Sequence, residues 1–300
     1  MAEAITTSGQ LSIRWIADEL NLFLNETIGT KDYDYIVASD TDSVYVRLGK
    51  LIERFLPDCT DTEKIVNFLD NSSEKIIQPL IDKKYEELAQ MMNAYENKMF
   101  MGREVIAERG VWTAKKRYAL NVWDSEGVRY EEPKLKIMGI ETTRSSTPAI
   151  VREKLKNAIR MILTKEEKDI QEYVAEFRDE FFSCEPEDIA FPRSVSNLEK
   201  WESSSEIYIS ATPIAVKGSL IYNHYIKKLK LEEKYEKIQQ GDKVKFIYLK
   251  EPNPISGMKG DKVISFPASI PKELDIHRFV DYNMQFTKSF LDPLETILNV

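Results

Sequence analysis

Hydrophobic positions recur every three or four residues near the start of the chain, which predicts an amphipathic helix. The positions of this stripe are Leu11, Trp15, Ile16, Leu20 and Phe23. Gly29 follows as a C-terminal cap. Next come two short β-prone runs, residues 35–38 and 44–46, separated by the polar residues 39–43. We expect these runs to form a hairpin.

Residues 50–97 have mostly helical periodicity, with predicted interruptions near Pro57 and at residues 71–73. A new helix is expected from Ser73, with a long buried face. Its apolar positions are Ile76, Ile77, Leu80, Ile81, Tyr85, Leu88, Met91 and Met92.

Residues 99–140 are rich in β-branched and aromatic side chains and predict strands, with a hairpin turn at residues 124–127. An antiparallel sheet packed on helices is the α+β pattern, and we assign it to residues 1–145 as one domain. Residues 149–183 have helical periodicity throughout, and the last 25 residues also predict a helix. Residues 146–300 therefore predict a second domain, mostly helical with a few short strands.

Composition changes this picture little. Of the 300 residues, 42% are hydrophobic and 31% are charged, which excludes a largely disordered chain. The net charge of −8 argues against a nucleic-acid partner. The two cysteines, Cys59 and Cys184, exclude a disulfide framework and a sulfur-rich zinc site. With only His224 and His277 present, carboxylates must carry any chemistry.

The sequence has neither an apolar run long enough to cross a membrane nor the pattern of a signal peptide. We therefore expect a cytoplasmic protein that has no membrane partner.

Two acids at i and i+2, Asp40 and Asp42, lie at the tip of the expected hairpin. Mg²⁺ prefers such oxygen ligands and usually binds through one or two carboxylates together with substrate phosphates. Asp and Ser are also common turn formers, and sugar transferases use a similar Asp-x-Asp pair. The strands on both sides and the absence of glycine favour a functional turn.

A basic cluster, Lys115, Lys116 and Arg117, precedes Tyr118 on a predicted strand. With Arg109 it places four positive charges within nine residues of an acidic chain. This pattern suits contacts with phosphates and groove edges. The alternative is a strand edge whose lysines oppose aggregation.

These motifs resemble those of family B DNA polymerases, most closely the enzymes of T-even-like phages and their cyanophage relatives. Residues 39–45 (SDTDSVY) resemble the third palm motif, and residues 115–123 (KKRYALNVW) resemble the primer-grip motif. Residues 133–139 (PKLKIMG) and 145–148 (SSTP) follow at matching spacing. The resemblance covers the whole chain, more strongly up to about residue 150. It implies a palm in residues 1–145 and a thumb in residues 146–300.

The resemblance implies a two-metal site for nucleotidyl transfer from a dNTP to a primer 3′-hydroxyl, with two Mg²⁺ ions or with Mn²⁺ as an alternative. Asp42 would bind both metals and Asp40 would shape the site, while Thr41 would lie at the nucleotide. Glu104 matches an acid beside the metals, but a plain surface charge is an equal alternative.

The resemblance also implies contacts with primer–template DNA. Lys116 would contact the minor-groove edge at the primer end, Tyr118 would lie against the 3′ end, and Lys115 and Arg117 would support them. Arg144, with Ser145 after it, matches a second minor-groove position. Lys134, Lys136 and Lys217 are candidates for phosphate contacts, with ordinary surface lysines as the alternative.

Some features depart from the family pattern. Ala38 and Ser39 replace the usual Tyr-Gly, and Gly102 replaces an acid. The chain also lacks room for the exonuclease domain, the fingers and the first palm aspartate, so we expect it to need an N-terminal polymerase part for activity. That part is either a separate chain or a missing segment. The C-terminal residues lack the aromatic clamp-binding tail of phage relatives, which leaves a sliding clamp as an open question.

Two other functions remain. The chain could be a non-catalytic fragment that binds primer–template DNA, or a sugar transferase. A sugar transferase would leave the basic cluster before Tyr118 without a function.

Overall fold

The computed structural model describes residues 2–140, 142, 144–203, 206–255 and 262–298. The chain divides into two compact units, and each is described by itself. Unit 1 contains Met1–Gly110 and Leu120–Lys136, and unit 2 contains Val111–Ala119 and Ile137–Val300. None of the helices in these described ranges is long and apolar enough to span a bilayer.

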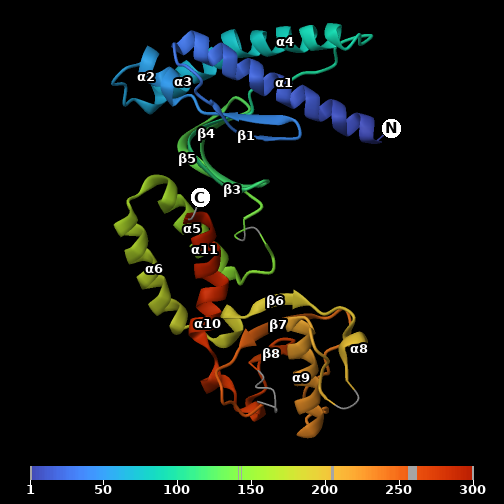
Figure 1. The fold of residues 1–300 in the computed structure, drawn as a ribbon. Coiled ribbons are helices and arrows are strands. Elements are labelled where there is room, and N and C mark those ends of the chain that lie inside the picture. Colours follow the sequence, from blue (N-terminus) through green and yellow to red (C-terminus); the bar gives the residue numbers. More distant parts are fainter. Residues whose placement is uncertain (1, 141, 143, 204–205, 256–261, 299–300) are drawn as a thin grey trace. The chain divides into compact units, whose positions relative to one another are not determined.

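Unit 1 is built on two long helices that lie side by side, α1 (Ala2–Ile28) and α4 (Gln78–Met91) (Figure 1). The indole of Trp15 donates to the backbone oxygen of Lys84 at 3.0 Å. The ammonium of Lys84 pairs with Glu19, also at 3.0 Å. Apolar side chains of both helices form a core: Ile16, Leu20, Ile81, Tyr85 and Leu88. The predicted first helix and its Gly29 cap, with φ +77°, are confirmed, although Leu11 is exposed.

The helices α2 (Gly49–Phe55) and α3 (Thr62–Ser72) follow, and Asp61 caps α3 by accepting from the Lys64 amide. The predicted interruption at residues 71–73 is wrong, because a π-helical turn, η1 (Ser73–Ile77), joins α3 to α4. A π turn holds extra backbone and shifts the phase of the helix faces. Ile76, predicted to be buried, is 51% exposed. Met91 and Met92, at the end of α4, are also exposed.

The predicted hairpin is confirmed as the antiparallel strands β1 (Ile36–Asp40) and β2 (Ser43–Val46). Asp40 pairs with Ser43, and a bulge interrupts the pairing between Ile36 and Ala38. Ile36, Val44 and Val46 pack against the α1–α4 core, which leaves the turn at the outer end of the hairpin.

A second sheet has the strand order β3–β4–β5 and comprises β3 (Val105–Ala114), β4 (Arg117–Ser125) and β5 (Val128–Met138). The tip of the β3–β4 hairpin belongs to unit 2, and its base belongs to unit 1. Residues 99–104, expected to be β-prone, have no regular structure.

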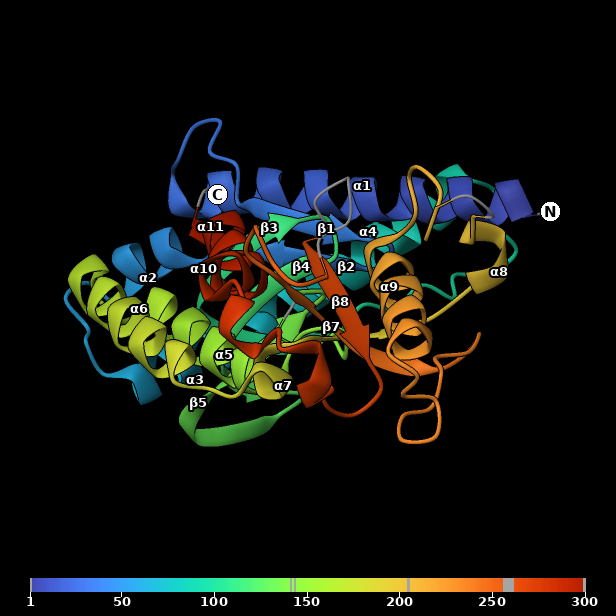
Figure 2. The same cartoon turned by 90° about the horizontal axis from the view of Figure 1, so that it is seen from below.

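Unit 2 pairs a three-stranded sheet with helices. The sheet contains β6 (Phe191–Ser194), β7 (Lys243–Tyr248) and β8 (Val263–Phe266), all antiparallel. Helix α9 (Ile214–Lys228) packs against β8 (Figure 2). At Gly218 an added Cβ would lie 2.5 Å from the Ser265 hydroxyl, so only glycine lets α9 approach so closely.

The other helices of unit 2 are α5 (Ala149–Thr164), α6 (Glu167–Phe182), α7 (Pro186–Ile189), α8 (Leu198–Trp201), α10 (Tyr282–Phe286) and α11 (Asp292–Leu298). Short 3-10 turns, η3 (Lys272–Leu274) and η4 (His277–Phe279), and a π turn, η5 (Thr287–Leu291), complete the unit.

The predicted continuous helix over residues 149–183 is two helices, because α6 begins with its own capping box at Glu166 and Asp169. Residues 276–281 are not part of the C-terminal helix, which begins at Tyr282. Both units combine helices with antiparallel sheets, so the α+β prediction is confirmed.

Candidate active site and DNA-contact residues

The acidic pair lies on the tight turn of the β1–β2 hairpin. Asp40 is half-buried, and Thr41 and Asp42 are exposed. The Thr41 hydroxyl donates to the Asp40 carboxylate at 3.0 Å, and the Asp42 amide donates to the Asp40 backbone oxygen at 2.6 Å. Thr41 has φ +53°, a left-handed conformation that β-branched residues rarely adopt. The turn is therefore a strained structure that presents two carboxylates at one end of the hairpin.

Helix α1 holds the base of this hairpin. The Asn21 amide oxygen accepts from the Tyr35 amide at 2.7 Å, and its amide nitrogen donates to Asp34 at 3.1 Å. The hydrogen bond from the Ile36 amide, and after it the one from the Asn21 side chain, lower the pKa of the Asp34 carboxyl below its usual value. The Arg47 guanidinium also donates to the Asp34 backbone oxygen. These contacts and the apolar core fix the position of the hairpin base relative to α1.

Glu104 is exposed, and its carboxylate lies 3.4 Å from the ammonium of Lys136. Its backbone oxygen accepts from the Glu126 amide at 2.7 Å. The adjacent Arg103 donates to Asp124 and to Asp70, which anchors this stretch of chain. Glu104 is thus a fixed surface carboxylate that pairs with a lysine of β5.

The carboxylates of Asp40 and Asp42 are oxygen donors of the kind that Mg²⁺ binds. Within the described residues, no three Asp, Glu, His or Cys side chains converge as a metal-binding group. The residues present therefore fit a divalent ion chemically but provide only part of a ligand set.

Lys115 and Lys116 form the two-residue turn between β3 and β4, and both side chains are exposed. Lys116 adopts φ +63°, again in the left-handed region. The Thr113 hydroxyl donates to the Arg117 backbone oxygen at 3.3 Å. Tyr118 is buried, and its ring packs on Trp112 with a centroid distance of 6.1 Å. The turn thus has two exposed lysine side chains, and the strands that it joins carry a packed aromatic pair.

Arg144 and Ser145 are exposed in unit 2. The guanidinium of Arg193, which sequence reasoning missed, donates to the Ser146 backbone oxygen at 2.6 Å. Burial lowers the pKa of Arg193, and the nearby positive charge of Arg144 lowers it further. A single arginine in a Phe-Pro-Arg-Ser strand gave no signal of this contact.

The remaining candidate lysines are each held near another side chain. The ammonium of Lys134 lies 4.0 Å from the centre of the Tyr130 ring, and that of Lys217 lies 4.6 Å from the Tyr208 ring. Unit 1 contains Asp40, Thr41, Asp42, Glu104, Lys134 and Lys136. Unit 2 contains Lys115, Lys116, Arg117, Tyr118, Arg144, Ser145 and Lys217.

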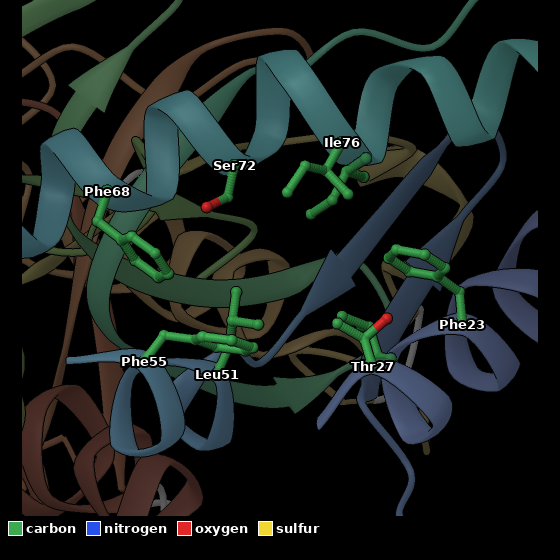
Figure 3. A pocket seen from close by; sticks show the side chains of 9 residues that line it. Phe23, Thr27, Leu51, Phe55, Phe68, Ser72 and Ile76 are labelled. Atoms are coloured by element: carbon green, nitrogen blue, oxygen red, sulfur yellow. The ribbon is translucent and has the colours of Figure 1, made fainter. Parts of the chain in front are cut away.

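Unit 1 also has an apolar pocket that sequence reasoning did not identify (Figure 3). Its volume is about 110 Å³, and side chains of α1, α2, α3 and η1 line it, including Phe23, Phe68 and Ile76. The only polar side chains at its wall are the hydroxyls of Thr27 and Ser72. Such a lining offers no acid–base or metal chemistry.

Comparison with known proteins gives a consistent result. The family model for DNA polymerase family B matches residues 2–298. The chain is 39% identical over 306 residues to a DNA-directed DNA polymerase of Enterobacteria phage T4. It is also 39% identical over 308 residues to a DNA-directed DNA polymerase of Escherichia phage RB69. Each match covers 98% of this chain and 33% of the relative, so the chain spans about a third of their length.

The acidic hairpin turn and the basic turn thus occur in a sequence that the family model matches from residue 2 to residue 298. The chain belongs to DNA polymerase family B.

Proposed function

We propose that this chain is the C-terminal palm and thumb part of a replicative DNA-directed DNA polymerase, with the palm in residues 1–145 and the thumb in residues 146–300. The observation that carries the proposal is the strained Asp40–Thr41–Asp42 turn, with Thr41 and Asp42 exposed, in a chain of family B. The substrates would be a dNTP and a primer–template DNA.

Asp42 and Asp40 would hold the metal ions, with Glu104 beside them. Two Mg²⁺ ions, or Mn²⁺, would supply activation of the primer hydroxyl and charge stabilisation at the phosphates. Within the turn, the Thr41 hydroxyl orients the Asp40 carboxylate, and the exposed Thr41 side chain would lie at the nucleotide. Lys136 neutralises part of the charge of Glu104.

Lys115 and Lys116 would contact the primer–template near the primer end. The exposed ammonium groups suit the acceptors of the minor groove, which are present in every base pair. Arg117 and the buried Tyr118 would support the turn, and Arg144 with Ser145 would make a second contact. Lys134, Lys136 and Lys217 would meet phosphates.

The two turn carboxylates are fewer than a two-metal site needs, and the chain spans a third of its relatives. We therefore propose that activity needs the rest of a polymerase, with the exonuclease, the fingers and a further palm aspartate, as a separate chain or as a preceding segment. Because these relatives are phage-encoded, the site of action would be the cytoplasm of an infected cell.

The alternative function is a non-catalytic fragment that binds primer–template DNA, and the exposed basic turn favours binding by either account. The test mixes the chain with a polypeptide that supplies the remaining polymerase, and then measures Mg²⁺-dependent extension of a labelled primer. Extension is expected from the mixture and from neither part alone. DNA binding without extension by a folded mixture would favour the alternative.

A further inference from the structure

Gly139 contacts the backbone of the basic turn in a way that no other residue type could. Its φ is +67°, and a Cβ at this position would lie 2.3 Å from the Lys116 backbone oxygen. The same Cβ would lie 3.2 Å from Cγ of Arg117. Real Cβ atoms essentially never come within 3.0 Å of another heavy atom, and a backbone oxygen cannot move aside cheaply. The absence of a side chain is therefore a geometric requirement here.

A hydrogen bond also joins the two segments. Nε of Arg117 donates to the Gly139 backbone oxygen at 3.2 Å. All three residues belong to unit 2, so the contact is internal to one compact body.

The other positive-φ glycines of the described chain differ from Gly139. At Gly29, Gly127 and Gly241, an added Cβ would meet nothing within 4 Å. These positions need glycine for their backbone angle alone, whereas Gly139 also needs it for close approach. Gly241, in unit 2 with φ +92°, is therefore a matched control.

We propose that Gly139 is a positioning residue for DNA binding, because it fixes the Lys115–Lys116 turn through the Lys116 carbonyl. This inference rests on the proposed function of the turn. Lys116 is in a left-handed conformation that a non-glycine residue keeps only when its surroundings hold it there. The close approach of the Gly139 backbone and the hydrogen bond from Arg117 to Gly139 provide that support.

An alanine at position 139 would push the Lys116 carbonyl away and move the turn by about 1 Å, a displacement that can cost about 100-fold where groups must be aligned. The lysine side chains are flexible and would recover part of this loss. We therefore expect primer–template binding to weaken by about tenfold, which is one tenfold step or 1.4 kcal/mol.

The experiment measures the dissociation constant of a fluorescein-labelled primer–template by anisotropy, for the chain mixed with the remaining polymerase. The variants are Gly139→Ala, Gly241→Ala, Lys116→Ala and the double variant Gly139→Ala/Lys116→Ala. We expect about tenfold weaker binding for Gly139→Ala and less than about twofold for Gly241→Ala. In the Lys116→Ala background, the effect of Gly139→Ala should be smaller than in the parent chain, since only the Lys115 ammonium is then left for the turn to position.

Arg117→Lys is a second variant that introduces no clash. It keeps the positive charge but removes the Nε donor to Gly139, so binding should weaken about threefold. Circular dichroism and thermal melting of each variant show whether it folds. If Gly139→Ala does not fold, primer–template binding by Arg117→Lys, alone and combined with Lys116→Ala, tests the proposal instead.

The inference is overturned if Gly139→Ala behaves like Gly241→Ala, or if its effect adds fully to that of Lys116→Ala, because addition would indicate a general structural role. Parent-like binding by Lys116→Ala would overturn the proposed DNA contact itself, and with it the role of Gly139. The two failures are therefore distinguishable.

Discussion

Thr41 and Lys116 lie at the centres of the two candidate functional turns, and both adopt positive φ angles, +53° and +63°. Among the described residues with positive φ, Thr41 is the one β-branched side chain. Left-handed backbone costs a non-glycine residue about 1–2 kcal/mol. The hydrogen bonds around Asp40 and the contact with Gly139 hold these conformations.

Replacing Thr41 by asparagine tests the strain at the acidic turn. Asn adopts the left-handed region more readily than Thr, so the free energy of unfolding should rise by about 0.5–1 kcal/mol in urea denaturation. Thr60→Asn is the control, because Thr60 is exposed and lies outside the positive-φ residues. Its effect should stay within about 0.5 kcal/mol. A lower stability for Thr41→Asn than for this control would contradict the strain argument.

At this scale the sequence predicted which residues form the acidic turn but not its geometry. The Asp-Thr-Asp-Ser run gives no signal for positive φ at Thr41, since propensity disfavours it. Gly139 offered a usable signal, because a glycine at the end of a β-prone run often marks close backbone approach. Arg193 offered none, because its partner is a backbone oxygen 47 residues away.

At the scale of elements, an ion network around the buried Asp124 joins α3 to the β3–β4–β5 sheet. The Asp124 carboxylate, with 1% of its side chain exposed, accepts from Arg103 and from Arg129, the latter at 3.0 Å. Both arginines also reach Asp70 of α3, at 2.6 and 3.3 Å. The network fixes the chain immediately before Glu104.

Asp124→Asn should destabilise unit 1 by about 3 kcal/mol, since it leaves two arginines beside an uncharged group. Burial raises the pKa of Asp124, but the hydrogen bonds from Arg103 and Arg129 outweigh it, so the pKa is lowered overall. A lowered pKa contributes stability above the unfolded value of about 3.9, and this contribution is lost as the pH falls through the folded value. Urea denaturation between pH 7 and pH 3 measures both effects.

The difference in the free energy of unfolding between the parent chain and Asp124→Asn should therefore become smaller below about pH 4. Glu126→Gln is the control, since Glu126 is exposed on the adjacent turn. A difference that stays constant with pH would contradict the assignment of this stability to the Asp124 carboxylate.

Gly218 and Gly9 form a second matched pair, because both lie inside helices. A Cβ at position 218 would lie 2.6 Å from the Ser265 amide nitrogen, whereas one at position 9 would meet nothing. Gly218→Ala should lower the free energy of unfolding by about 1–3 kcal/mol through overpacking. Gly9→Ala should raise it by up to about 1 kcal/mol through helix propensity. Equal effects of the two would contradict the close packing of α9 on β8.

Two β-prone runs around a polar segment predicted the β1–β2 hairpin. Periodicity predicted α1, whose apolar stripe contributes to two cores. It failed at residues 71–77, where Asn and Ser normally favour a break but burial of Ser72 and a π turn continue the helix. The helical periodicity also did not separate α5 from α6, because the break at Lys165 and Glu166 is two residues long and barely changes the hydrophobic pattern.

For the molecule as a whole, the net charge of −8 misleads because charge is unevenly distributed along the chain. Residues 98–144 hold ten Lys and Arg against seven Asp and Glu, a local charge of 10 − 7 = +3. Local clusters rather than the total determine contacts with phosphates. The acidic net charge of the chain is therefore compatible with the proposed polymerase function.

The most direct test of this function is the effect of Asp42→Asn on Mg²⁺-dependent primer extension by the chain together with the remaining polymerase. Asp42 is exposed at the turn, so the variant should fold and bind primer–template like the parent chain. Extension should fall by on the order of 10²–10³-fold or more, because a preorganised charge at the reacting phosphate is lost. Asp58→Asn, at another exposed aspartate of unit 1, should keep full extension. Unchanged extension by Asp42→Asn would contradict the proposed function.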